Sequence, residues 1–225
     1  MPKMPQFTDW LVWQLADSAF PAGAFAHSFG LEAAWQQGEV DGATLGAFVR
    51  DAVAQAAHGS LPFVSAAHRE PDGVAAIDAH CEAFVRTSVA NRASRVQGRA
   101  WLTTVERSFP RSEIAAVADR LRASSSPRHF APVYGATLRA LGVPLETTER
   151  LFVFGTCRAL LSAAVRLGIT GTTAAQRLLA EMADELESLA RSCSDLAMSD
   201  AAQTAPLIDL WQGAHDRLYS RLFQS

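Results

Sequence analysis

Lysine is almost absent from the sequence: of its 20 basic residues only Lys3 is a lysine, and the rest are arginines. The 23 acidic residues outnumber them, so the formal net charge is −3 and no overall positive field attracts phosphates. This balance argues against nucleic-acid binding, and so against a helical DNA-binding regulator, which needs a basic recognition helix.

Cysteine and long hydrophobic runs are also scarce. Cys81, Cys157 and Cys193 are odd in number, widely spaced and outside any C-x-x-C pattern, which favours neither a disulfide framework nor a zinc site. No run approaches the ~18 apolar residues of a membrane span, and the first residues lack the apolar region of a signal peptide. We therefore expect a cytoplasmic protein with no membrane segment.

The motifs of common enzymes are missing as well. There is no P-loop and no G-x-S-x-G, and the glycine-rich residues 168–173 are interpreted as a turn between helices. The six histidines show neither the i, i+4 spacing nor the Glu-x-x-His pattern of helical metal sites. The sequence thus predicts no catalytic residue, no metal site and no stably bound cofactor. A helical metalloenzyme using His27, His80, His129 or His215 is kept as the alternative.

The hydrophobic pattern is helical almost throughout. Apolar residues make up 49% and charged residues 19%, which is typical of a globular domain, and apolar side chains recur at steps of three and four. Expected helices cover 42–57, 74–108, 147–167 and 174–196, with a break near Gln97–Gly98 and a stop at Gly168. We predict an all-α, single-domain bundle of roughly eight to ten helices over 1–225, with 1–8 a flexible N-terminus.

Two polar strips stand out on these expected helices. Arg92, Arg95 and Arg99 share a face at i, i+3 and i+7, and Arg158, Ser162 and Arg166 form a similar strip. For the first strip a solvated or salt-bridged face is favoured over a partner site, and both readings stay open.

The loop before residue 32 is unusual because it is apolar and aromatic, whereas loops are normally polar. Residues 15–32 read LADSAFPAGAFAHSFGLE, and Ser28 could cap the following helix. A loop buried under its own domain and an interaction surface are both possible. At the other end, 205–225 form an amphipathic segment with aromatic residues, which is either a docking arm or a piece folded back on the bundle.

These segments carry a resemblance to one family. The loop is similar to the signature of the urease accessory protein UreF family, and the similarity continues in QGRAW at 97–101, HFAPVYG at 129–135, SAAVRLG at 162–168 and RLYSRLFQS at 217–225. Ala24 and Phe20 depart from the signature. The resemblance implies partner-binding residues at the matching positions: Pro21, Gly23, Ser28, Gly30, Leu31, Glu32, Arg99, His129, Tyr134, Arg166, Arg217, Leu218, Tyr219, Arg221 and Phe223.

The same resemblance implies a function. A member of this family is expected to be a non-catalytic, all-helical chaperone that binds UreD (also called UreH), recruits the nickel GTPase UreG and docks on apo-urease. It would assist GTP-dependent nickel insertion, modulate GTP hydrolysis and form a homodimer, while nickel and GTP are handled by its partners. By the same analogy, 205–225 would order against UreD.

Overall fold

The computed structural model describes residues 9–21 and 26–224, and within them the all-α prediction is confirmed. The expected flexible N-terminus, 1–8, lies outside the described residues. The described chain forms twelve α-helices and three short 3-10 turns. The helices are α1 Asp9–Ala16, α2 Leu31–Gln36, α3 Leu45–Gly59, α4 Leu61–Arg69, α5 Val74–Phe84, α6 Ser88–Ser108, α7 Ser112–Ala123, α8 Phe130–Ala140, α9 Leu145–Arg166, α10 Thr172–Glu181, α11 Ala183–Cys193 and α12 Pro206–Ala214.

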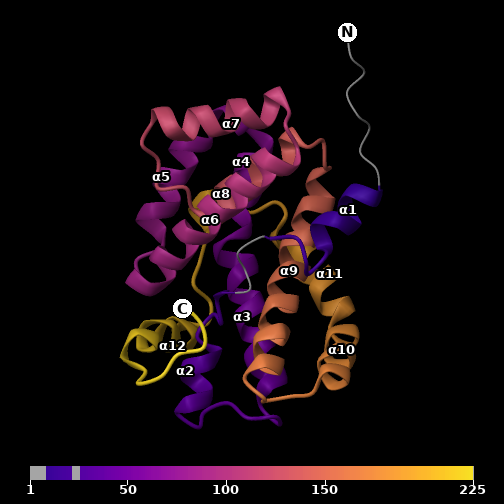
Figure 1. The fold of residues 1–225 in the computed structure, drawn as a ribbon, viewed down its shortest axis with the longest axis vertical. Helices are drawn as coiled ribbons and strands as arrows, with labels where there is room; N and C mark the ends of the chain where they lie inside the picture. The colour runs from indigo at the N-terminus through magenta and orange to yellow at the C-terminus, as the bar shows by residue number, and fades with distance from the viewer. Residues whose placement is uncertain (1–8, 22–25, 225) are drawn as a thin grey trace.

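The helices surround one continuous hydrophobic core (Figure 1). Helix α4 packs most extensively on α8, and α6 packs on the same helix. Helices α10 and α11 stand beside α9, while α7 lies across the upper end in Figure 1. At the lower end, α12 lies against α2 and α6, so the last helix covers one of the first.

The expected break at Gln97–Gly98 is wrong: the helical stretch 74–108 divides at 85–87, and Gly98 lies inside α6. A Cβ atom at Gly98 would lie 2.1 Å from the carbonyl oxygen of Arg128. The glycine therefore lets α6 touch the backbone that leads into α8. It was misread because this close approach is tertiary and leaves no local signal.

One further helix boundary differs from expectation, and another is confirmed. The predicted helix 174–196 divides at Met182, a fully buried residue between α10 and α11. The N-cap residue of α10 is Gly171, and no side-chain hydrogen bond caps the helix there. The expected stop at Gly168 is confirmed: its φ is +74°, and its amide and that of Ile169 donate to carbonyls in the last turn of α9.

The cysteines belong to the core. Cys81, Cys157 and Cys193 are buried and free, and His80 beside Cys81 is exposed, as its place on the helix predicts. Burial raises the pKa of the Cys157 thiol to about 12, so this thiol stays protonated and packs as a small apolar group. None of the helices in the described ranges combines the length and the apolar character needed to cross a membrane.

Candidate functional site

The apolar loop ends at Gly30, the N-cap residue of α2, with a φ of +85°. A Cβ atom at this position would lie 2.9 Å from the backbone nitrogen of Gln212 and 3.0 Å from Cβ of Trp211. Only glycine combines this φ with so close a contact to α12. The expected cap by the Ser28 side chain is wrong: the Leu31 amide donates to the carbonyl of Ser28, and no side chain caps α2.

Glu32, in the first turn of α2, fixes the end of the chain. Its side chain is almost completely buried and accepts hydrogen bonds from the amides of Leu222, at 2.6 Å, and Phe223, at 3.1 Å. Nε2 of the buried His215 lies 3.0 Å from the same carboxylate. We call residues 215–224 the C-terminal strap. Three contacts converge on one carboxylate, so the strap is held at its first residue and again near its end.

One further hydrogen bond holds the end of the strap: the Gln224 amide donates to the carbonyl of Ala26 at 2.8 Å. The Phe223 ring is buried beneath Arg166 of α9, whose guanidinium carbon lies 4.2 Å from the ring centroid. The strap thus joins the loop, α2 and α9 at the lower end of the molecule (Figure 1).

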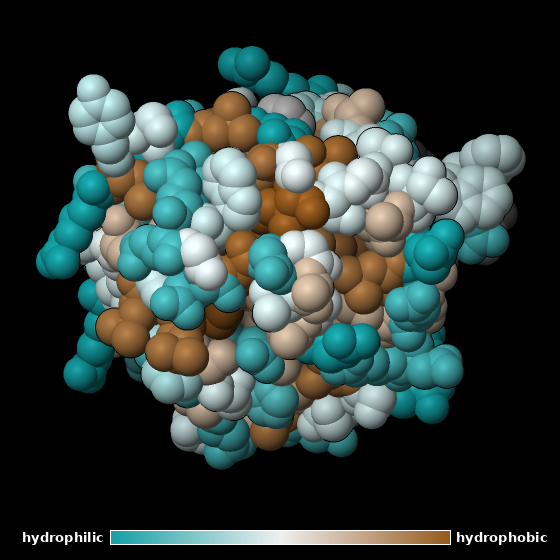
Figure 2. Space-filling view, turned by 90° about the horizontal axis from the view of Figure 1, so that it is seen from below, coloured by the Kyte–Doolittle hydropathy of each residue, from teal (hydrophilic) through white to brown (hydrophobic). Residues whose placement is uncertain are grey.

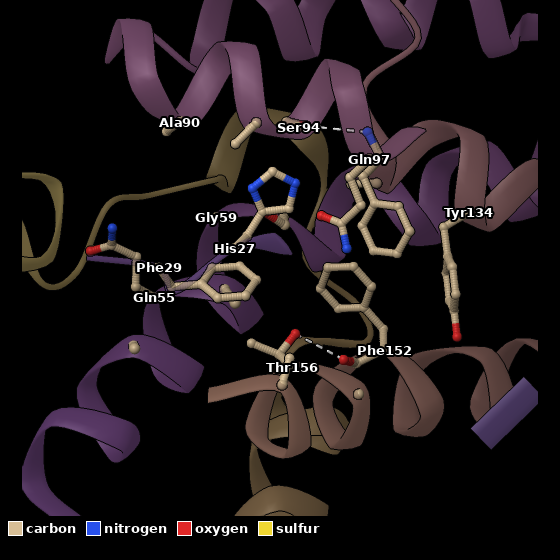
Figure 3. Close-up of a pocket in the computed structure, with 18 of the residues that line it drawn as sticks. His27, Phe29, Gln55, Gly59, Ala90, Ser94, Gln97, Tyr134, Phe152 and Thr156 are labelled. Atoms are coloured by element: carbon tan, nitrogen blue, oxygen red, sulfur yellow. Dashed lines mark hydrogen bonds between the residues drawn. The ribbon is translucent and has the colours of Figure 1, made fainter. Parts of the chain in front are cut away.

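His27 follows Ala26, whose carbonyl binds the strap, and it lines a cavity of about 190 Å³ between the helices (Figure 3). Burial, together with the charge of His215, lowers the pKa of His27 to about 4. The imidazole is therefore neutral near pH 7. Gln97 and Thr156 add polar groups to a wall that is otherwise largely apolar (Figure 3).

The aromatic wall of this cavity contains Tyr134. The centroid of its ring lies 4.8 Å from the ring centroid of Trp101, 5.2 Å from that of Phe130 and 5.7 Å from that of Phe152. Burial raises the pKa of the phenol, which keeps it neutral. Tyr134 thus helps to pack α6, α8 and α9 together.

His129 has an equally internal place at the start of α8. Its Nε2 atom lies 2.6 Å from a carboxylate oxygen of Glu82, and its Nδ1 atom lies 3.1 Å from the Ser94 hydroxyl. Asp78 accepts the amides of Arg128 and His129 at 2.7 and 2.6 Å. The hydrogen bond from His129 lowers the pKa of Glu82. This network ties the entry of α8 to α5 and α6.

No metal centre forms among residues 9–21 and 26–224: three or more histidine, cysteine or carboxylate side chains do not gather anywhere in them as metal ligands would. Of the histidines named for a metalloenzyme, His129 pairs with Glu82, His215 with Glu32, and His80 is exposed. His27 lies near His215.

Comparison with known proteins gives a consistent result. The model of the UreF family matches residues 39–183. The chain is 36% identical to urease accessory protein F of Oryza sativa subsp. indica over 98% of this chain and 87% of the relative. It is 34% identical to urease accessory protein F of Arabidopsis thaliana over 100% of this chain and 96% of the relative. For urease accessory protein UreF of Paenarthrobacter aurescens the identity is 31%, over 94% of this chain and 96% of the relative.

The chain belongs to the UreF family. Its predicted partner-binding residues divide into three groups by exposure. The exposed group is Pro21, Arg99, Arg217, Tyr219 and Arg221; the partly exposed group is Arg166 and Leu218; the buried group is Ser28, Gly30, Leu31, Glu32, His129, Tyr134 and Phe223. Gly23 lies outside the described residues.

For this UreF family member, the structure joins the two segments that resemble the family most, the loop and the chain end, through Glu32. The buried residues of both segments stabilise this chain, and their contact with a partner stays a prediction. Sequence reasoning missed Asp78 and the pairing of His215 with Glu32. Asp78 lies on the buried side of an amphipathic stretch, where a carboxylate is unusual, and that was the available signal.

Proposed function

We propose that this chain is a non-catalytic urease maturation factor that holds UreD (UreH) and the nickel GTPase UreG together on apo-urease in the cytoplasm. It assists GTP-dependent nickel insertion and modulates GTP hydrolysis, while nickel and GTP are handled by the partner proteins. It acts as a homodimer. Family membership along nearly the whole chain supports this role, as does a sequence without a P-loop.

The proposed binding role rests on the C-terminal strap, which has one buried side and one side exposed to solvent. Its inner side is held by Glu32, whereas Tyr219 is fully exposed and Leu222 is 53% exposed. The adjoining α12 exposes Leu207 and Leu210. Figure 2 views this lower end, where hydrophobic residues reach the surface between hydrophilic ones. Large apolar side chains on an anchored backbone are typical of a protein interface.

The test is size-exclusion chromatography with light scattering of the chain mixed with its cognate UreD and UreG. The full-length chain is expected to form a complex, and a chain ending at Thr204 is expected to lose it. Because that truncation also leaves Glu32 without its partners, the sharper variant is Tyr219→Ala with Leu222→Ala. It keeps every backbone amide that Glu32 binds.

A matched control removes exposed aromatic area at the other end of the chain, through Trp10→Ala with Trp13→Ala in α1. The strap variant should weaken the complex more than this control does. A well-folded full-length chain that forms no complex would overturn the proposal. If both variants weakened the complex equally, the strap would not be the binding surface.

A further inference from the structure

A shallow hollow of about 610 Å³ lies between the end of α5 and the first half of α6, next to the start of the strap, which contacts it through Asp216. Four arginines line it, Arg86, Arg92, Arg95 and Arg99, and the only acidic residue in its lining is Glu82. On a chain with a formal net charge of −3 this is a local reversal of sign.

Most of these arginines have no acidic partner to balance their positive charge. In the described part of the chain Arg92 pairs with Asp216 at 2.7 Å, but Arg86, Arg95 and Arg99 form no salt bridge. Glu82 cannot neutralise them all, because one carboxylate carries a single negative charge, and one of its oxygens also lies 2.6 Å from Nε2 of His129. Arg95 lies close enough to contribute to the lowered pKa of Glu82, behind the larger effect of the hydrogen bond from His129. The hollow therefore retains an excess of guanidinium groups.

The spacing of the arginines along α6 fits the spacing of side chains in an extended peptide. At 1.5 Å of rise per residue, Arg92 and Arg99 are about 10 Å apart along the helix axis, with Arg95 between them. In an extended peptide, side chains on the same side recur about every 7 Å. Two carboxylates on alternate residues can thus reach this row together. The first turn of α6, at Ser88, adds the partial positive charge of a helix N-terminus.

From this arrangement we propose that the hollow binds an extended acidic segment of another protein, with carboxylates on alternate residues. Guanidinium groups hold carboxylates through planar paired hydrogen bonds, which suits a cluster made only of arginines. A nucleic acid is disfavoured because its long, uniformly charged backbone would also meet the net negative remainder of the chain. The inference does not depend on the role in urease maturation.

The test measures fluorescence anisotropy of a short labelled peptide of alternating glutamate and threonine with the full-length chain. A peptide of alternating glutamine and threonine and a single-stranded oligothymidylate of matched length serve as comparison probes. The acidic peptide should bind, and its affinity should fall with added salt. Arg95→Glu with Arg99→Glu should weaken it about tenfold or more, because two attractive charges become repulsive.

A matched control reverses two exposed arginines outside the hollow, Arg107→Glu with Arg177→Glu, so that the net charge changes equally. It should bind the acidic peptide within about twofold of the unmodified chain. If the double reversal in the hollow fails to fold, Arg95→Gln with Arg99→Gln keeps the test, because it removes charge without adding repulsion. A glutamine peptide bound as tightly as the glutamate one, equal weakening in the control, or preferred binding of the oligonucleotide would each overturn the proposal.

Discussion

Glu32 shows at the scale of a single residue how the two ends of this chain depend on each other. Its buried carboxylate lies within hydrogen-bond distance of His215 and accepts hydrogen bonds from the amides of Leu222 and Phe223. Glu32→Ala leaves these donors unsatisfied, so the free energy of unfolding should fall by about 3 kcal/mol. Urea denaturation measures the loss, and limited proteolysis should cut the strap first.

Glu39→Ala is the control for this prediction, because Glu39 is exposed and is also a glutamate near α2. It should change the free energy of unfolding by less than about 0.5 kcal/mol. Equal denaturation midpoints for the two variants would show that Glu32 does not hold the strap.

His27 makes stability depend on pH. In the unfolded chain it takes up a proton near its ordinary pKa of 6.5, whereas in the folded chain it does so only at about pH 4. Between these values the unfolded state binds more protons, so the free energy of unfolding should be level above about pH 7 and fall as the pH drops towards 4. For His27 alone the loss is about 3 kcal/mol at most.

The measurement is a series of urea denaturation curves between these two pH values for the unmodified chain, His27→Gln and His80→Gln. His27→Gln should make the dependence shallower, because this group no longer titrates; a smaller slope should remain, because burial also lowers the pKa of His68. His80 is exposed, so His80→Gln should leave the slope as it is. A slope in His27→Gln as steep as that of the unmodified chain would contradict the assignment.

At the scale of helices, Gly98 tests how closely α6 and α8 must approach. A Cβ atom there would lie 2.1 Å from the Arg128 carbonyl oxygen, so Gly98→Ala should cost about 2 kcal/mol or more of unfolding free energy. Gly155→Ala in α9 is the control, because a Cβ atom there has no neighbour within 4 Å. It should be neutral or stabilise the fold by up to about 1 kcal/mol. Similar thermal midpoints for both variants would contradict the close approach.

The helices themselves were largely predictable from the sequence, but their divisions were not. The 3.6-residue apolar period located α3 and α9 to within about three residues. The helical stretches divide at 85–87 and at Met182, and neither place contains a glycine or a proline. The local sequence therefore did not indicate that a helix ends there. Gly98 wrongly indicated a helix end, because in the sequence a glycine that permits a tertiary contact looks like a helix breaker.

At the scale of the whole molecule, resemblance located the two segments of the site, and the structure supplied what joins them. Glu32 and Leu222 are separated by 190 positions, and no local pattern predicts a hydrogen bond over that distance. The acidic residue was visible in the sequence, but its burial was not. Three of the four arginines share a helix face that the sequence predicts, but the hollow that joins Arg86 to them needs the turn between α5 and α6.

The proposed function requires that nickel reach urease only with the help of this chain and that the chain is not itself a catalyst. The most direct measurement incubates apo-urease with nickel, GTP, UreD and UreG, with and without the full-length chain, and records the nickel content and activity of the urease. Urease should gain nickel and activity only when the chain is present, and the chain without UreG should hydrolyse no GTP. Equal activation of urease without the chain would contradict it.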